Sequence, residues 1–182
     1  MKMFNKILMG SEFNENLLKT GVFFDGDEEA AVEDGAVVSV KGLMDHDLYT
    51  GLKDFNARKI TAFDADAPIF GFVDYVGVSE LRDSDNVVYR IGDKTAGLAP
   101  GAGDRTRVRI PVIGDEFYLG DENFTGTPAV GKFAAPVAGD TTLTVADAAD
   151  TTTLCVEIED TKTLITGQVN AGTLYRCRVI SL

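Results

Sequence analysis

The sequence has no tryptophan and a single histidine, and these scarcities remove several kinds of catalytic site. His46 lies between Asp45 and Asp47, but a zinc set would need further histidine or cysteine ligands, which the chain does not supply. No serine or cysteine partner stands near His46 in sequence for nucleophilic catalysis, so we expect a solvated loop histidine. A carboxylate pair for glycoside hydrolysis could be drawn from 29 acidic residues. Sugar sites usually supply aromatic platforms as well, and without tryptophan we expect no enzyme.

Cysteine is also scarce, with only Cys155 and Cys177 present. Neither belongs to a CxxC motif, so a metal or redox site is not indicated. Both lie in apolar runs near the C-terminus, which favours two small buried hydrophobes, with a disulfide as the alternative. This cysteine usage is typical of a protein that folds in a reducing cytoplasm.

Long apolar runs are missing too. No stretch approaches the eighteen or so apolar residues that a membrane-spanning helix needs, so we expect no membrane partner. The N-terminal segment MKMFNKILMG is interrupted by Asn5 and Lys6, and no small-residue cleavage site follows. We therefore expect no secretory signal.

Basic residues are fewer than acidic residues. The chain has 17 Lys and Arg against 29 Asp and Glu, which gives a net charge of −12. Phosphate binding requires a positive surface, so nucleic acid is not expected as a direct partner. An acidic balance favours a protein that stays soluble at high copy number or meets a basic partner.

What the sequence does contain is a long series of short strand patterns. From Asp34 onward apolar and polar residues alternate, or form short apolar runs, between turns rich in glycine. The run 69–78 is almost wholly apolar and predicts a central strand covered on both faces, whereas residues 45–56 look like helix or loop. We expect an all-β fold, a barrel or sandwich of about ten short strands. Its predicted core consists of Phe70, Phe72, Val73, Val76, Val108, Ile110, Phe117, Val156, Ile158 and Val179.

Two segments differ from this body, which is expected to span residues 34–182. Residues 1–33 include an acidic run and predict an extended N-terminal arm with little core of its own, although its apolar residues could instead fold back onto the body. The second segment, residues 136–153, is poor in large side chains and predicts either a linker or a loop excursion.

Three short patterns resemble parts of known ligand-binding motifs but lack residues that those motifs require. Gly101 and Gly103 lack the third glycine and the Lys-Ser/Thr pair of a phosphate loop. Residues 25–28 and 63–68 place carboxylates two apart, but neither continues with the glycine and glutamate of an EF-hand loop. We expect no cofactor and no metal ion.

The most ordered pattern is Arg105, Arg107 and Arg109, which alternate with Thr106, Val108 and Ile110 on one strand. Alternation predicts arginines on one face and apolar residues on the core face. Three guanidinium groups in an acidic protein favour acidic partners, either on the chain itself or on another subunit. The three arginines are therefore the candidate docking surface, with a solvated and internally paired strand face as the alternative.

The order of several segments resembles a known group of proteins. The stretches VEDGAVVSVKGL, LYTGLKDFNARKITA, IFGFVDYVGVSE and RVRIPVIGDEFYLGDENFTGTPAVGKFAAP occur in one series over residues 33–136. In this series the chain resembles the auxiliary, or head decoration, proteins of tailed-bacteriophage capsids. The likeness rests on strand and turn segments rather than on a catalytic signature.

The resemblance implies a non-enzymatic virion protein that binds the outside of an assembled shell of major capsid protein and stabilises it. It also implies synthesis in the host bacterial cytoplasm, and association of the chain with itself as a homo-oligomer remains open. Two alternatives stay open: another phage structural component, such as a tail-tube, connector or fibre-like element, or a cellular β-barrel binding module.

Overall fold

A computed structural model describes residues 4–10, 14–45, 53–74, 79–82, 88–91, 101–166 and 169–182. The regular elements among these residues are strands, apart from single turns of 3-10 helix, so the predicted all-β class is confirmed. The elements are β1 (Phe4–Leu8), η2 (Glu15–Leu17), β2 (Leu18–Asp25), β3 (Glu28–Glu29), β4 (Val37–Asp45), β5 (Lys53–Ala62), β6 (Phe70–Asp74), β7 (Ser79–Arg82), β8 (Val88–Ile91), β9 (Thr106–Arg109), β10 (Glu116–Gly120), η4 (Asp121–Asn123), β11 (Phe124–Thr125), β12 (Phe133–Pro136), β13 (Leu143–Ala146), β14 (Cys155–Thr166) and β15 (Val169–Ser181).

Five strands close into a barrel. The hydrogen-bonded order is β2-β5-β4-β6-β9, and a further pairing of β9 with β2 completes the circuit. Strand β2 is parallel to β5, and the other contacts around the barrel are antiparallel. The short strand β3 extends one end of β2 through a hairpin whose turn contains Gly26, at a φ of 63° that glycine accommodates without strain. Because closure pairs both sides of each strand, the barrel removes edges that would otherwise be open.

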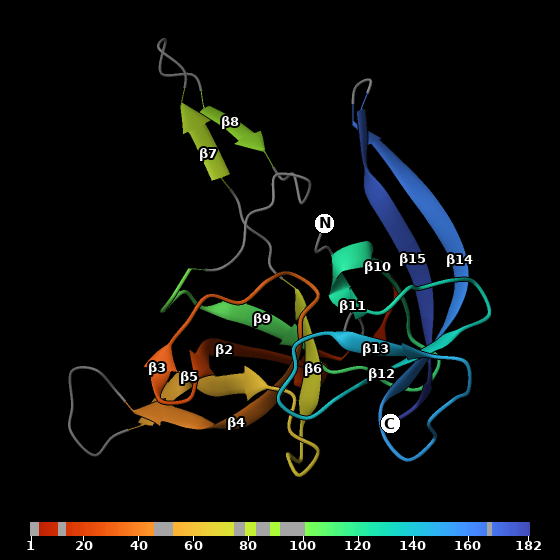
Figure 1. The fold of residues 1–182 in the computed structure, drawn as a ribbon. Helices are drawn as coiled ribbons and strands as arrows, with labels where there is room; N and C mark the ends of the chain where they lie inside the picture. Colours follow the sequence, from red (N-terminus) through yellow and green to blue (C-terminus); the bar gives the residue numbers. More distant parts are fainter. Residues whose placement is uncertain are drawn as a thin grey trace.

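A second sheet of seven strands packs beside the barrel (Figure 1), in the order β1-β10-β15-β14-β12-β13-β11. The main core lies between them, where the Phe72 ring of β6 meets the Phe117 ring of β10 with centroids 4.7 Å apart. A smaller core fills the barrel itself and includes Val38, Ile60, Val73 and Val108.

Strands β4 and β6 contribute to both cores, because successive side chains point to opposite faces of a strand. Val37 and Phe72 belong to the main core, whereas their neighbours Val38 and Val73 belong to the barrel core. The prediction of a doubly covered strand in 69–78 is confirmed for Phe70–Asp74, and residues 75–78 lie outside the described residues.

Most of the predicted core is buried. Phe70 and Ile110 are only half-buried, and Val76 lies outside the described residues. The remaining seven are buried: Phe72, Val73, Val108, Phe117, Val156, Ile158 and Val179. Cys155 and Cys177 are buried free thiols, so the prediction of small buried hydrophobes is confirmed and the disulfide alternative is wrong.

The N-terminal arm requires correction. Within residues 1–33, β1 pairs with β10 in the seven-stranded sheet, and β2 is a barrel strand between β5 and β9. Val22 and Phe23 are buried at 3% and 8% exposure, so this segment folds back and supplies core. Four acids of the run that made it look detached lie exposed in the β2–β3 hairpin: Asp25, Asp27, Glu28 and Glu29.

Two further segments differ from expectation. Residues 136–153 contain β13, which lies between β12 and β11 and buries Leu143, so they form neither a linker nor a simple loop. Their small residues suit the tight turns on either side of that strand. Residues 53–56, predicted as helix or loop, begin β5 instead, while residues 46–52 lie outside the described residues.

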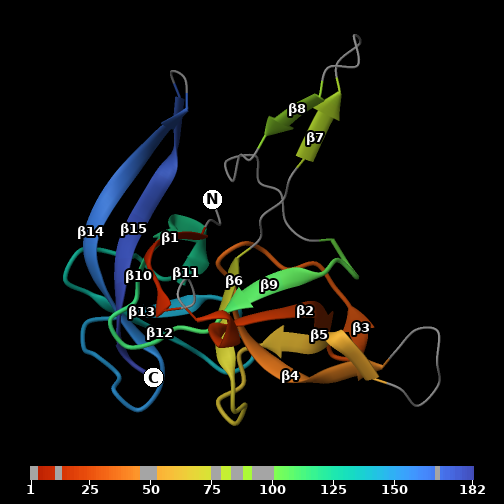
Figure 2. The same cartoon turned by 180° about the vertical axis from the view of Figure 1, so that it is seen from behind.

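Strands β14 and β15 form a long ribbon that extends past the body of the molecule, as the opposite views in Figures 1 and 2 both show. The β7–β8 hairpin also projects on that side.

Candidate docking surface

The three predicted docking arginines occupy three different environments. Arg105 is exposed just before β9, and the Arg107 side chain is 40% exposed. Arg109 is only 5% exposed, and its Nε lies 2.5 Å from Oδ2 of Asp74, which is 2% exposed. Arg107 reaches the same carboxylate at 4.0 Å. Arg109 is therefore buried and cannot belong to an exposed docking surface, so only Arg105 and Arg107 remain as candidates.

The register of the barrel explains this gradient. Arg109 is paired with Phe72 across β9 and β6, and paired residues project from the same face of a sheet. Phe72 points out of the barrel into the main core against Phe117, so the second sheet covers that face at Arg109. The coverage ends toward Arg107, and Arg105 lies beyond it. Arg107 and Arg109 lie on one face of β9, as alternation predicted, but the second sheet covers that face at Arg109. Arg105 precedes the strand.

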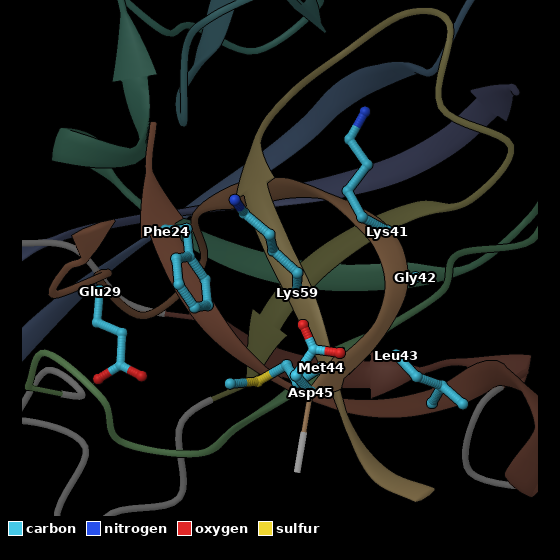
Figure 3. A pocket seen from close by; sticks show the side chains of 8 residues that line it. All are labelled: Phe24, Glu29, Lys41, Gly42, Leu43, Met44, Asp45 and Lys59. Carbon is cyan, nitrogen blue, oxygen red and sulfur yellow. The ribbon is translucent and has the colours of Figure 1, made fainter. Parts of the chain in front are cut away.

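A shallow groove of about 490 Å³ lies on the barrel beside β3, β4 and β5 (Figure 3). It is lined by Phe24, Glu29, Lys41, Gly42, Leu43, Met44, Asp45 and Lys59. The lining combines two lysines with two acids, together with the apolar side chains of Phe24, Leu43 and Met44.

Both lysines of this groove interact with carboxylates of the chain itself. Lys59 Nζ lies 4.7 Å from the centre of the Phe24 ring and 3.3 Å from Asp27. Lys41 forms an ion pair with Asp64, and its hydrogen bond holds the pKa of that carboxyl below its ordinary value. The groove is consequently a balanced polar surface rather than an anion-binding site.

A third cluster, which sequence analysis missed, crosses the face of the seven-stranded sheet. Arg176 of β15 pairs with Glu116 of β10 and Glu159 of β14, and Arg178 pairs with Glu157 and Glu159. The attraction of Glu159 raises the pKa of Arg178, and the hydrogen bond to Glu116 raises that of Arg176. The cluster ties three strands together with charges that largely neutralise one another.

The signal for this cluster was present in the sequence. Arginines alternate in LYRCRVI and glutamates alternate in CVEIE, which is the pattern of two strands whose exposed faces carry opposite charges. Recognising it required knowing that these two runs are hydrogen-bonded neighbours.

The remaining candidates contribute no site. Within the ranges that the structure describes, no group of three or more His, Cys, Asp and Glu side chains is arranged to hold a metal ion. His46 lies outside those ranges, and the 101–105 loop forms a turn in which the Gly101 amide donates to Asp104 at 2.8 Å. Across the described residues, no helix is long and apolar enough to cross a membrane.

Comparison with known proteins returned no matching family model, no matching curated protein and no matching solved structure.

Proposed function

We propose that this chain is a non-enzymatic virion protein that binds the outside of an assembled phage capsid and stabilises it. Its partner would be the major capsid protein, and it would be made in the cytoplasm of the host bacterium. The resemblance of residues 33–136 to head decoration proteins supports this role. Those residues supply most of the barrel and the strands β10 to β12 that pack beside it.

The observation that carries the docking mode is the exposed end of the β9 arginine row. Arg105 and Arg107 bring positive charge to the surface of a protein whose net charge is −12. An acidic patch on a capsid subunit would complement them, whereas the rest of the acidic surface would stay in solvent. Such a contact has limited apolar area, so attachment should be moderate in affinity and weakened by salt.

Binding can be measured directly by co-sedimentation of the purified protein with capsid shells that lack it. The proposal predicts saturable binding that decreases as ionic strength rises. Arg107→Ser should weaken it, and the matched control is Lys132→Ser, since the two side chains are 40% and 39% exposed and both face an aspartate. The double variant Arg105→Ser/Arg107→Ser should weaken binding further. Absence of binding to shells would refute the proposal, and equal effects of R107S and K132S would refute this docking mode.

A second candidate is another structural component of the particle, such as a tail-tube, connector or fibre-like element. The projecting β14–β15 ribbon favours this reading, because a ribbon that extends past its own body suits repeated assembly between copies. Electron microscopy of particles labelled through this chain separates the two: decoration predicts label over the whole head, and the alternative predicts label on the tail or at one vertex.

A further inference from the structure

The groove beside β3, β4 and β5 lies at an irregular part of the barrel wall. Strands β4 and β5 are antiparallel, but their register shifts between Val40 and Leu43 and again between Leu43 and Asp45. Such bulges change the direction of side chains and are common next to functional sites. Val40 is still part of the barrel core, whereas Leu43 and Met44 are half-buried and line the groove instead.

The β2–β3 hairpin forms the other side of the groove. Phe24 is paired with Glu29 across this hairpin, and residues directly opposite each other project from the same face. Both line the groove, and Figure 3 shows the Met44 side chain extending toward the side on which they lie. The groove therefore has an apolar floor, formed by Phe24, Leu43 and Met44, and a carboxylate at its rim.

The charge that surrounds this floor is negative. Each lysine of the groove forms an ion pair with a carboxylate of the chain itself, so neither adds a net positive charge. The hairpin brings further acids to the same rim, because Asp25, Glu28 and Glu29 are all exposed. A ligand in the groove would therefore contact apolar side chains below it and carboxylates beside it.

We propose that this groove binds a basic segment of another protein. One apolar side chain of the segment would lie on the floor, and the lysine or arginine side chains next to it would pair with Glu28 and Glu29. Burial of the apolar side chain supplies part of the affinity. The pairs at the rim are exposed to solvent, so binding should be weak and sensitive to salt.

Charge complementarity determines this choice of occupant. A chain with a net charge of −12 attracts a basic segment and repels an acidic one, including a second copy of itself. The apolar floor adds a requirement that charge alone does not make, because it favours a segment with an apolar side chain between its basic residues. The inference does not rest on a role in a capsid, since it concerns a different surface from Arg105 and Arg107.

Fluorescence anisotropy of a labelled peptide, Arg-Arg-Leu-Arg-Arg, tests the proposal against about 1 to 500 µM of the full chain. We expect saturable binding that weakens as salt is added. The peptide Arg-Arg-Ser-Arg-Arg has the same charge without the apolar side chain and should bind at least about fivefold more weakly. The peptide Glu-Glu-Leu-Glu-Glu should not bind.

Two pairs of variants separate the groove from the general charge of the protein. Glu28→Gln/Glu29→Gln should raise the dissociation constant of the leucine peptide by at least about fivefold. The control Asp140→Asn/Asp160→Asn makes the same charge change at exposed positions that do not line the groove, and should raise it by less than about twofold.

The second pair changes the space in the groove and not its charge. Gly42 lines the groove, and nothing lies within 4 Å of a Cβ at this position, so a longer side chain can enter without displacing a neighbour. Gly42→Gln should weaken binding of the leucine peptide, whereas Gly42→Ala should bind it like wild type.

Three results would overturn the proposal. The first is no binding of the leucine peptide over the whole concentration range. The second is equal binding of the leucine and serine peptides, which would show attraction by charge alone. The third is an equal effect of the two charge-changing double variants, or of G42Q and G42A, which would place the contact outside the groove.

Discussion

The Nε atom of Arg109 lies 2.5 Å from Oδ2 of Asp74, and both side chains are buried where the barrel meets the second sheet. The pair joins β9 to β6, which are hydrogen-bonded neighbours in the barrel. A buried ion pair contributes little net stability compared with an apolar pair, but the loss of one partner leaves an uncompensated charge. The contribution of the pair to stability can therefore be measured by removing Arg109 alone and then both partners together.

Arg109→Met should destabilise the protein by about 3–5 kcal/mol, because it leaves the Asp74 carboxylate buried without its principal cation. Arg105→Ala, at an exposed position just before the same strand, should change the free energy of unfolding by less than about 0.5 kcal/mol. Urea unfolding measures both. The double variant Asp74→Asn/Arg109→Met should recover part of the loss. Similar free energies of unfolding for R109M and R105A would show that losing the Arg109 partner leaves no costly buried charge at Asp74.

Closure of the barrel depends on a close approach at Gly71. A Cβ there would overlap the carbonyl oxygen of Arg109 and lie 2.8 Å from the Val108 side chain. Gly71→Ala should therefore destabilise the protein by about 1–3 kcal/mol, as overpacking does in cores. Gly42→Ala is the control, since nothing lies within 4 Å of its Cβ position. Thermal unfolding that is unchanged in G71A would contradict the tight β6–β9 contact.

Two carboxylates should show opposite dependence of stability on pH. Burial raises the pKa of Asp115 above 3.8, despite hydrogen bonds from the Val112 and Gly10 amides, and the Lys41 contact lowers that of Asp64. A raised pKa in the folded state favours the protonated form, so the contribution of Asp115 is present at low pH and is lost as pH rises through its folded pKa. The contribution of Asp64 is present above its unfolded pKa and is lost as pH falls through the lowered value.

The measurement is urea unfolding of Asp115→Asn and Asp64→Asn beside wild type, from about pH 3 to 7. The stability advantage of wild type over D115N should shrink as pH rises, whereas its advantage over D64N should grow. If both differences move in the same direction, one of the two environments is not as described.

The cysteines should be unreactive in the folded protein. Burial raises the pKa of both Cys155 and Cys177, so little thiolate forms at neutral pH. A thiol reagent such as DTNB should label neither residue in native conditions and both after denaturation. A reducing agent should leave the melting temperature unchanged. Labelling of one thiol at the rate of a free cysteine would contradict its burial.

The sequence was informative where the alternation of apolar and polar residues along one strand determines which side chains are buried. The runs around Phe72 and Val108 gave the strands and most of the core, because a closed barrel with a second sheet buries period-two patterns on one or both faces. It was uninformative about side chains whose burial depends on a second sheet packing over them. Arg109 and Arg107 look alike in sequence, and only the second sheet distinguishes a buried cation from a half-exposed one. The ion pairs of Arg176 and Arg178 also depend on which strands become neighbours.

The same limit explains the N-terminal segment. Its acidic turn gave it the composition of a detached arm, whereas Val22 and Phe23 complete the barrel through long-range pairing with β5 and β9. Deletion of residues 1–33 should therefore prevent folding rather than release a removable extension.

The central claim is that this chain decorates an assembled shell, and its copy number in purified particles tests this most directly. A quantitative gel of purified virions compares the band of this chain with that of the major capsid protein. The account predicts a band that approaches the major capsid band, as hundreds of copies per particle would give. A band equivalent to about a dozen copies, or no band at all, would contradict a decorating role.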